Sequence, residues 1–480
     1  MSSSANKKIY IHVVIMFLLG YIVSILPPIG QITPMGMDVL GVFVILIYGW
    51  IFVDIFWISL IGFFLLGLTN VSTIAQAFIT AFSNQTVITM LIVFALAAGL
   101  NELGIGDMIA NYILSRKFLI GKPWVLIAAF VATAFFLSVI GKGMIGCILL
   151  CTIAGNILKA CDYEDRSPLM SFLFCMIGYG ALLPMNIIPF QPTMLMNSAI
   201  YTNAIPNLIQ PFGAYMLIGC AIYAVTFIIM ILLAKYVFHI DASKFNITEE
   251  MCNEFAQKKP SKVTKVAMIT LCIYVLILIL PEFLPATIPG VAIAKKIGLM
   301  GWTIIFLGIF SLWRDKETGA PALSLERCFG QMQWTTIMLV SVTLPVSNAL
   351  SNADVGVMAT IAQWITPILS GFSIFGLYVF AFILVSVLSQ FLHNMVVAVL
   401  FLPLFGTVAI SMGANPYILY FLMFMGLNTA YATPAGCGTG ALIFGNKQIE
   451  RKYAYIWGLL VSVIMTIVAI LLYPVYGFIF

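Results

Sequence analysis

Long apolar stretches separated by short polar ones run along almost the whole chain of 480 residues. Three examples are Val266–Pro281, Ile374–Leu392 and Tyr453–Phe480. The last two approach or exceed the roughly 20 residues that a helix needs to cross a bilayer. The pattern therefore predicts an all-α polytopic membrane protein, with the lipid bilayer as its main partner.

Composition strengthens this prediction. Hydrophobic residues make up 62% of the chain and charged residues only 8%, whereas a soluble domain is about one quarter charged. The net charge of +5 is spread over loops. Sorting of positive charge to the cytoplasmic side of a membrane explains it without a nucleic-acid partner.

The first 30 residues resemble a signal peptide, with Lys7 and Lys8 ahead of an apolar run. That run is long and leads to Pro27 and Pro28 rather than to a small-residue cleavage site. We interpret residues 1–30 as a retained first transmembrane helix with a cytoplasmic N-terminus, in the plasma (inner) membrane.

A polar linker near the middle divides the remainder into two halves. We place it at residues 239–264, rich in lysine and therefore cytoplasmic. It separates residues 31–238 from residues 265–480. At the other end of the chain, lysines and arginines precede the last apolar run and no charge follows it. That run is therefore expected to cross from inside to outside.

The two halves share a weak sequence repeat. "TVITMLIVFALAAGLNELGIGDM" begins at Thr86 and "TIMLVSVTLPVSNALSNADVGVM" at Thr336, an offset of 336 − 86 = 250. At nearly the same offset, "LSVIGKGM" from Leu137 lies over "LSQFLHNM" from Leu388. Transporters often consist of two such repeats with inverted topology, and we predict that arrangement here.

Polar residues interrupt the apolar pattern at matching places in each half. We predict two re-entrant helical hairpins, near residues 139–161 and 389–411. Two broken helices follow, at "LLPMNIIPFQPTMLMN" and "YATPAGCGTGALIFGN". Non-helical backbone is tolerated at membrane depth only where protein buries it or a watery cavity meets it. Paired breaks of this kind therefore indicate a binding site near the midplane.

The residues at these interruptions suit an anion. Neither hairpin tip contains Asp or Glu, and the N-terminal ends of short helices attract negative charge. A cation pathway would carry carboxylates. The predicted substrate-binding residues are Lys142, Gly143, Gln191, Pro192, Thr193, His393, Asn394, Thr433, Pro434 and Gly438.

Two of these residues have alternative interpretations. Lys142 could instead lie nearer the surface and reach water with its long side chain. His393 could touch the anion, carry a coupling proton or only cap the hairpin by hydrogen bonds. Asn394 is the strongest single candidate, because an amide both donates to an anion and offers an oxygen to a cation.

Other classes of protein fit less well. The only histidines are His12, His239 and His393, and no GxSxG motif is present, so we do not expect an enzyme. The nine cysteines form no CxxC pair, so neither a disulfide framework nor a metal cofactor is expected. An anion channel could use the same positive cavity, although it would not need two broken hairpins.

Three segments resemble the divalent-anion/sodium symporter family of the ion transporter superfamily, whose members carry dicarboxylates, citrate and sulfate. They are "AFSNQTVITMLIVFALAAGLNELGIGDMIA", "LSQFLHNMVVAVLFLPL" and "ATPAGCGTGALIFG", and the likeness extends from about Gly41 to Phe480. The resemblance implies a homodimer in which a transport domain slides against a scaffold, an elevator-type fold. It also implies Na⁺ bound by the hairpin tips.

Each tip departs from the Ser-Asn-Thr sequence of that family. The second tip reads His393-Asn394-Met395 and keeps only the Asn, while the first reads Lys142-Gly143-Met144 and keeps none. We therefore place Na⁺ at the second hairpin alone, held by His393, Asn394, Met395 and Gly436. At the first tip we hypothesise that the Lys142 ammonium replaces one sodium ion.

These inferences together predict a secondary active transporter of small divalent anions, first of all C4-dicarboxylates. Exchange or proton coupling could replace coupling to two sodium ions. The alternatives are a carrier of sulfate, citrate or another oxyanion, and an anion channel.

Overall fold

The computed structural model is helical along its length and confirms the all-α polytopic prediction. It describes residues 3–139, 143–189, 191–205, 208–257, 259–285, 287–314, 319–332, 334–369, 371–392, 394–433 and 437–480. Within these ranges the only strand-like pairing is an isolated bridge between Arg314 and Pro321. Nine described helices are long and apolar enough to cross a membrane, or ten if one bent pair counts as a single span.

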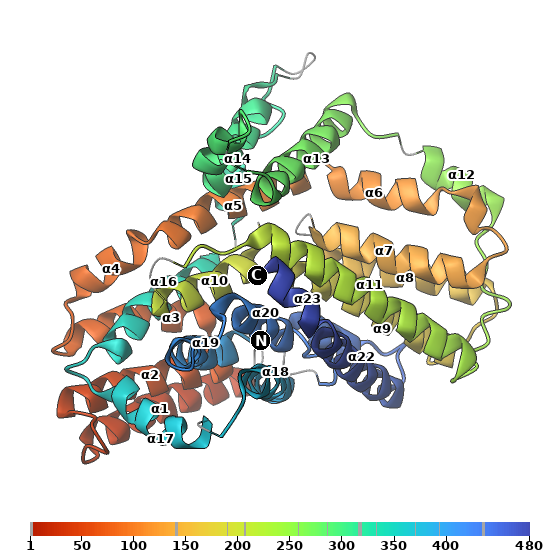
Figure 1. The fold of residues 1–480 in the computed structure, drawn as a ribbon. Coiled ribbons are helices and arrows are strands. Elements are labelled where there is room, and N and C mark those ends of the chain that lie inside the picture. The colour runs from red at the N-terminus through yellow and green to blue at the C-terminus, as the bar shows by residue number, and fades with distance from the viewer. Residues whose placement is uncertain are drawn as a thin grey trace.

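The described residues of the first half form eleven α-helices and two short 3₁₀ segments (Figure 1). They are α1 Ser3–Ile25, α2 Pro34–Phe52, α3 Ile55–Leu68, α4 Ile74–Phe82, α5 Gln85–Glu102, α6 Ile105–Leu114, η1 Lys117–Leu119, α7 Pro123–Val139, α8 Gly143–Ala160, α9 Pro168–Leu182, η2 Leu183–Asn186, α10 Pro192–Ala204 and α11 Phe212–Tyr236.

The second half follows a similar order. Its helices are α12 Glu249–Gln257, α13 Lys262–Phe283, α14 Val291–Leu312, α15 Leu325–Gly330, α16 Trp334–Ser351, α17 Val357–Leu369, α18 Ile374–Phe391, α19 Asn394–Ser411, α20 Pro416–Leu427, α21 Gly438–Gly445, α22 Arg451–Leu471 and α23 Tyr473–Ile479. α16 begins 334 − 85 = 249 residues after α5, and α19 begins 394 − 143 = 251 residues after α8. Helices thus recur at the spacing of the sequence repeat, while the opposite orientation of the two halves stays a prediction.

Local signals explain where several helices begin. Asp54 interrupts an apolar run, and its Oδ1 accepts a hydrogen bond from the backbone N–H of Trp57 at 2.6 Å. It therefore caps α3 and separates it from α2. Prolines stand at the first position of α9, α10 and α20, where the missing N–H removes no helical hydrogen bond.

Each hairpin packs around the helix that follows it. α7 and α8 pack against α9, and α18 and α19 pack against α20. The halves also interlock, because α10 packs on α19 while α21 packs on α9. Buried tyrosines join them: the rings of Tyr201 and Tyr420 lie 4.9 Å apart, as do those of Tyr179 and Tyr431. This interlocking brings the breaks of one half against the helices of the other.

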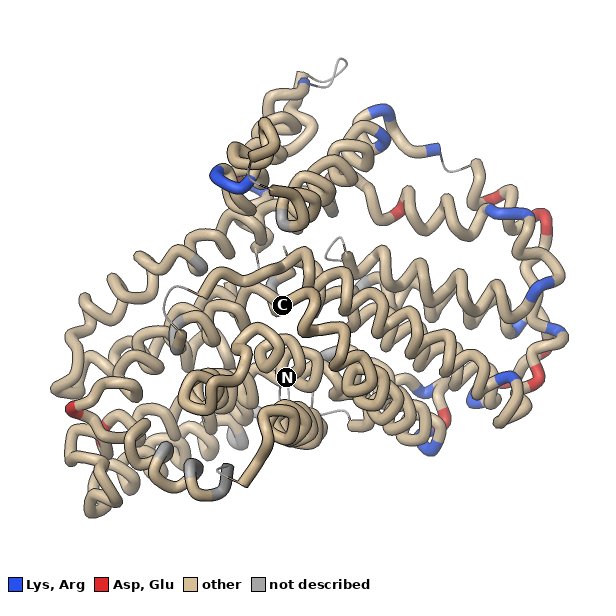
Figure 2. The backbone as a smooth tube through the Cα atoms, in the orientation of Figure 1, with Lys and Arg blue, Asp and Glu red and all other residues tan. Residues whose placement is uncertain are grey.

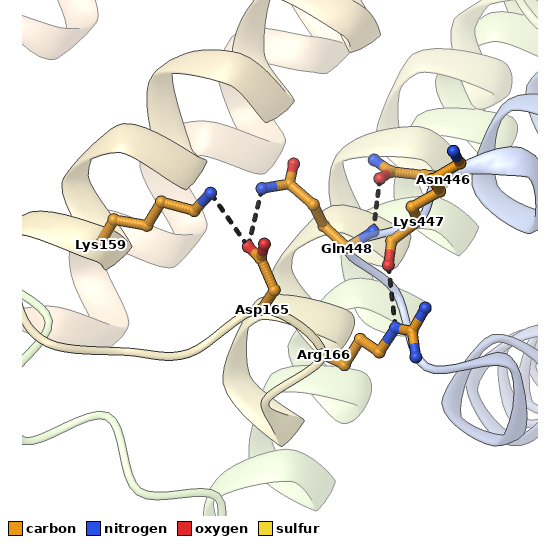
Figure 3. Close-up of polar contacts among 6 residues, drawn as sticks. All are labelled: Lys159, Asp165, Arg166, Asn446, Lys447 and Gln448. Carbon is orange, nitrogen blue, oxygen red and sulfur yellow. Dashed lines mark hydrogen bonds and ion pairs between the residues drawn. The ribbon is translucent and has the colours of Figure 1, made fainter.

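Charged residues gather at one end of the molecule, on the right of Figure 2. There the loop between α8 and α9 meets the loop between α21 and α22 (Figure 3). Lys159 pairs with Asp165 at 3.2 Å, the Gln448 amide donates to Asp165 at 2.9 Å, and Arg166 donates to the Lys447 carbonyl at 3.0 Å. The pKa of Asp165 is lowered, mainly by the hydrogen bond from the Gln448 amide and secondly by the hydrogen bond from Lys159.

The predicted linker lies against this same end. Glu249 of α12 forms an ion pair with Lys117 of η1, and the Asn246 side chain accepts a hydrogen bond from the Gly121 backbone N–H at 2.6 Å. Because positive charge is retained on the cytoplasmic side, this end is expected to face the cytoplasm.

Candidate anion-binding site at the hairpin tips and helix breaks

The first break is tied to the first hairpin tip by Gln191. This residue precedes α10 and is 1% exposed. Its Nε2 donates to the carbonyls of Ser138 at 2.8 Å and Val139 at 2.7 Å, at the end of α7. The last carbonyls of a helix have no hydrogen-bond donor within that helix. Gln191 supplies a donor to two such carbonyls at the end of α7. Lys142, the predicted tethered cation, lies outside the described residues.

The start of α8 leaves little room for a side chain at Gly143. A Cβ there would lie 3.0 Å from the Ser138 Oγ and 3.1 Å from the Ala181 carbonyl oxygen. The backbone of the first hairpin is thus close to α9 at Gly143. A side chain there would require these neighbours to shift by a few tenths of an ångström.

The second tip presents a buried amide. Asn394, the first residue of α19, is 8% exposed. Its Nδ2 lies 3.5 Å from the Asn428 Oδ1, and its own Oδ1 has no hydrogen-bond partner among the described residues. The neighbouring His393 lies outside the described residues, and Met395 is half-buried.

Gln390 ties the second break to the second tip, as Gln191 does in the first half. Its Nε2 donates to the Thr429 carbonyl at 2.6 Å, and its Oε1 accepts from the Ala432 N–H at 3.0 Å. The Thr433 hydroxyl donates to the Gln390 carbonyl. Thr433 is thereby placed at the tip, while Pro434 and Gly436 lie outside the described residues.

Two equivalent serines stand out in these hairpins. Ser138 and Ser389 are aligned in the sequence repeat, both are fully buried, and neither hydroxyl has a partner within the described part of the chain. A buried polar group without a partner costs about 1–3 kcal/mol. Such groups are rare in native proteins and call for an explanation. A bound ligand or ion would supply the missing partner.

The remaining predicted residues lie at helix starts. Pro192 begins α10, Thr193 follows it and is half-buried, and Gly438 begins α21. Cys437 caps α21, its Sγ accepting from the Gly440 N–H at 3.3 Å. The prediction missed Gln390, Asn428 and Cys437. The glutamine beside the "LS" of the second tip was the one signal that could have revealed Gln390.

A hollow of 340 Å³ lies between the first hairpin and the second break. Cys147 and Thr152 of α8 line one side, and Ile443 of α21 and Asn446 line another. It is also lined by Gln448, which takes part in the polar contacts shown in Figure 3. Both halves of the chain therefore contribute walls to this hollow.

Comparison with known proteins identifies the family. The profile of the citrate transporter family (CitMHS) matches residues 42–426, well over half of the chain. The protein belongs to this family. It is therefore a membrane transporter of organic anions rather than an enzyme. The narrower resemblance to divalent-anion/sodium symporters stays a prediction.

Two relatives are themselves uncharacterised transporters. One from Haemophilus influenzae is 22% identical over 81% of this chain and 80% of its own length. Another from Synechocystis is 24% identical over 32% of this chain, and the match spans only a quarter of that protein.

Solved structures share the fold. The YdaH transporter of Alcanivorax borkumensis has a TM-score of 0.57 at 13% identity, covering 84% of this chain and 88% of YdaH. MtrF of Neisseria gonorrhoeae, described among antimetabolite efflux pumps, has a TM-score of 0.55 at 12% identity. The match covers 98% of this chain and 94% of MtrF. At such low identity these likenesses concern the fold alone.

Proposed function

We propose that the protein is a secondary active transporter of small anions with two or more carboxylates. The observation that carries this proposal is the matched pair of buried, unpartnered hydroxyls, Ser138 and Ser389, together with the buried Asn394 amide, whose Oδ1 is also unpartnered among the described residues. Hydroxyl and amide groups donate to carboxylates. Citrate, after which the family is named, and C4-dicarboxylates are the two substrates to test.

The proposed mechanism is of the elevator type. Each hairpin packs with its following helix, and this packing supports α7–α9 and α18–α20 as the proposed moving part. The helices at the N-terminal end of the chain, together with α13 and α14, would form the scaffold. Dimerisation through this scaffold would fix its position in the membrane. Na⁺, if coupled, would bind at the second tip, where the unpartnered Asn394 Oδ1 offers a ligand oxygen.

Lys142 is proposed to supply one positive charge at the first tip in place of a sodium ion. Replacing Lys142 with alanine should abolish uptake of doubly charged anions, and Lys142→Arg should preserve part of it because the charge is kept. Lys159→Ala, at the far end of α8, is the matched control and should leave uptake unchanged. Normal uptake by Lys142→Ala would refute this role.

An anion channel is the remaining competitor. Proteoliposomes loaded with labelled citrate or succinate separate the two. A carrier shows saturable uptake that anion on the opposite side accelerates, whereas a channel passes a current that rises linearly with anion concentration. Sulfate in the same assay tests the inorganic alternative.

A further inference from the structure

A second and larger hollow lies beside the first break, away from the tips. Its volume is 650 Å³, within the range of about 300–1,000 Å³ typical of small-molecule sites. Its walls come from α5, α13, α14, the segment before α11 and Pro189 of the first break. The residues used below are Gln85, Pro189, Gln210, Phe212, Pro281 and Lys295.

The electrostatics of this hollow favour a negative ligand. Lys295 on α14 lines it, with Nζ donating to the Leu284 carbonyl at 3.3 Å. Among the described side chains Lys295 has no carboxylate partner. Two helices also begin at the hollow, α5 at Gln85 and α11 at Phe212. The N-terminal end of a helix carries about half a positive charge.

Gln210 supplies a hydrogen-bond donor that has no protein acceptor. It is 8% exposed and lines the hollow. Its Oε1 accepts a hydrogen bond from the Tyr215 hydroxyl at 2.7 Å, which orients the amide. Its Nε2 has no partner within the described part of the chain. A carboxylate oxygen in the hollow would satisfy this buried N–H group.

The backbone of α14 is interrupted at the same place. Gly298 lines the hollow. Its backbone angles, φ 61° and ψ −176°, define a conformation that residues other than glycine avoid. The Trp302 indole donates to the Ala294 carbonyl at 3.2 Å, and so compensates for a helical hydrogen bond at the interruption. The interruption is therefore supported by its surroundings, and Lys295 is held one turn before it.

The hollow opens on the side of the membrane opposite to the linker. Phe212 is the first residue of α11 and Pro281 lies near the end of α13, whereas the linker joins the other ends of these two helices. A cytoplasmic linker therefore places the hollow at the external face. Pro189 of the first break forms part of its wall.

We propose that this hollow is an outer binding site for small carboxylates, in which Lys295 and Gln210 hold the anion before it reaches the first break. The route to the break rests on the proposed transport function. The binding site itself does not, since it follows from charge and an unpartnered donor.

The test measures local potential and occupancy directly. Cysteine is introduced at Ala294, which also lines the hollow, and its reaction with an anionic and a cationic methanethiosulfonate is followed at that residue by mass spectrometry. The anionic reagent should react preferentially. Lys295→Gln should lower that preference about five-fold, since a charge a few ångströms away is removed. Lys296→Gln, at an exposed neighbour that does not line the hollow, should leave it unchanged.

Citrate provides the second readout. Millimolar citrate should slow the modification of the introduced cysteine, and Gln210→Leu should weaken this protection while leaving the reagent preference as it was, because an amide carries no charge. Equal effects of Lys295→Gln and Lys296→Gln, or no protection by citrate or succinate, would overturn the proposal. Each ratio is taken within one variant, so differences in yield cancel.

The outcome is separable from that of the proposed function. Cysteine labelling does not require transport. Protection by citrate without any uptake would therefore refute the proposed transport function but support the outer binding site. Saturable uptake without protection would refute the outer site and keep the carrier.

Discussion

Asn394→Ala should abolish most transport with only a small loss of stability. The amide is buried, and its Oδ1 has no partner among the described residues, so removing it sacrifices little stability, within about 1 kcal/mol. Loss of a hydrogen bond to a charged ligand weakens binding by about 10- to 100-fold. Initial rates of citrate and succinate uptake, with thermal unfolding of the purified protein alongside, measure both effects.

Asn415→Ala is the matched control for that result. The Asn415 side chain caps α20 by accepting from the Tyr417 N–H at 2.9 Å, so its loss should lower stability by about 1 kcal/mol. The apparent affinity for the anion should not change. If Asn394→Ala kept its affinity for the anion, as Asn415→Ala should, Asn394 would have only a structural role and the proposed site at the second tip would be refuted.

Gln191→Leu should destabilise the protein and slow transport together. Leucine of similar size cannot donate to the Ser138 and Val139 carbonyls. Two buried acceptors are thereby left unpartnered, at a cost of about 2–3 kcal/mol. The first break also loses its tie to the first tip, so the maximal uptake rate should fall. Thermal unfolding and uptake kinetics on one preparation test the two effects.

Gln331→Leu serves as the control for Gln191→Leu, because Gln331 is exposed at the end of α15. It should alter neither quantity. A Gln191→Leu protein with unchanged thermal stability would contradict the role assigned to the amide, whatever its uptake rate.

The membrane class could be predicted because it depends on local sequence. An apolar run of sufficient length encodes a span directly, and Asp54 marks a helix start through its own side chain. The family could be predicted only coarsely. The profile match gives citrate transporters, and the narrower symporter family stays a prediction.

The contacts that build the tips could not be predicted, because they join residues distant in sequence. Gln191 reaches a carbonyl 53 positions away and Gln390 one 39 positions away. Only tertiary packing decides which glutamine meets which helix end. Lys142 and His393 lie outside the described residues, so their meeting at one anion also stays a prediction.

Counterflow in proteoliposomes tests the central claim most directly. Vesicles containing the purified protein are loaded with unlabelled citrate or succinate, diluted into a trace of the labelled anion, and compared with vesicles loaded with chloride. The account predicts uptake that saturates with external anion and is several-fold faster into anion-loaded vesicles. Flux that rises linearly with concentration and ignores the internal anion would contradict it.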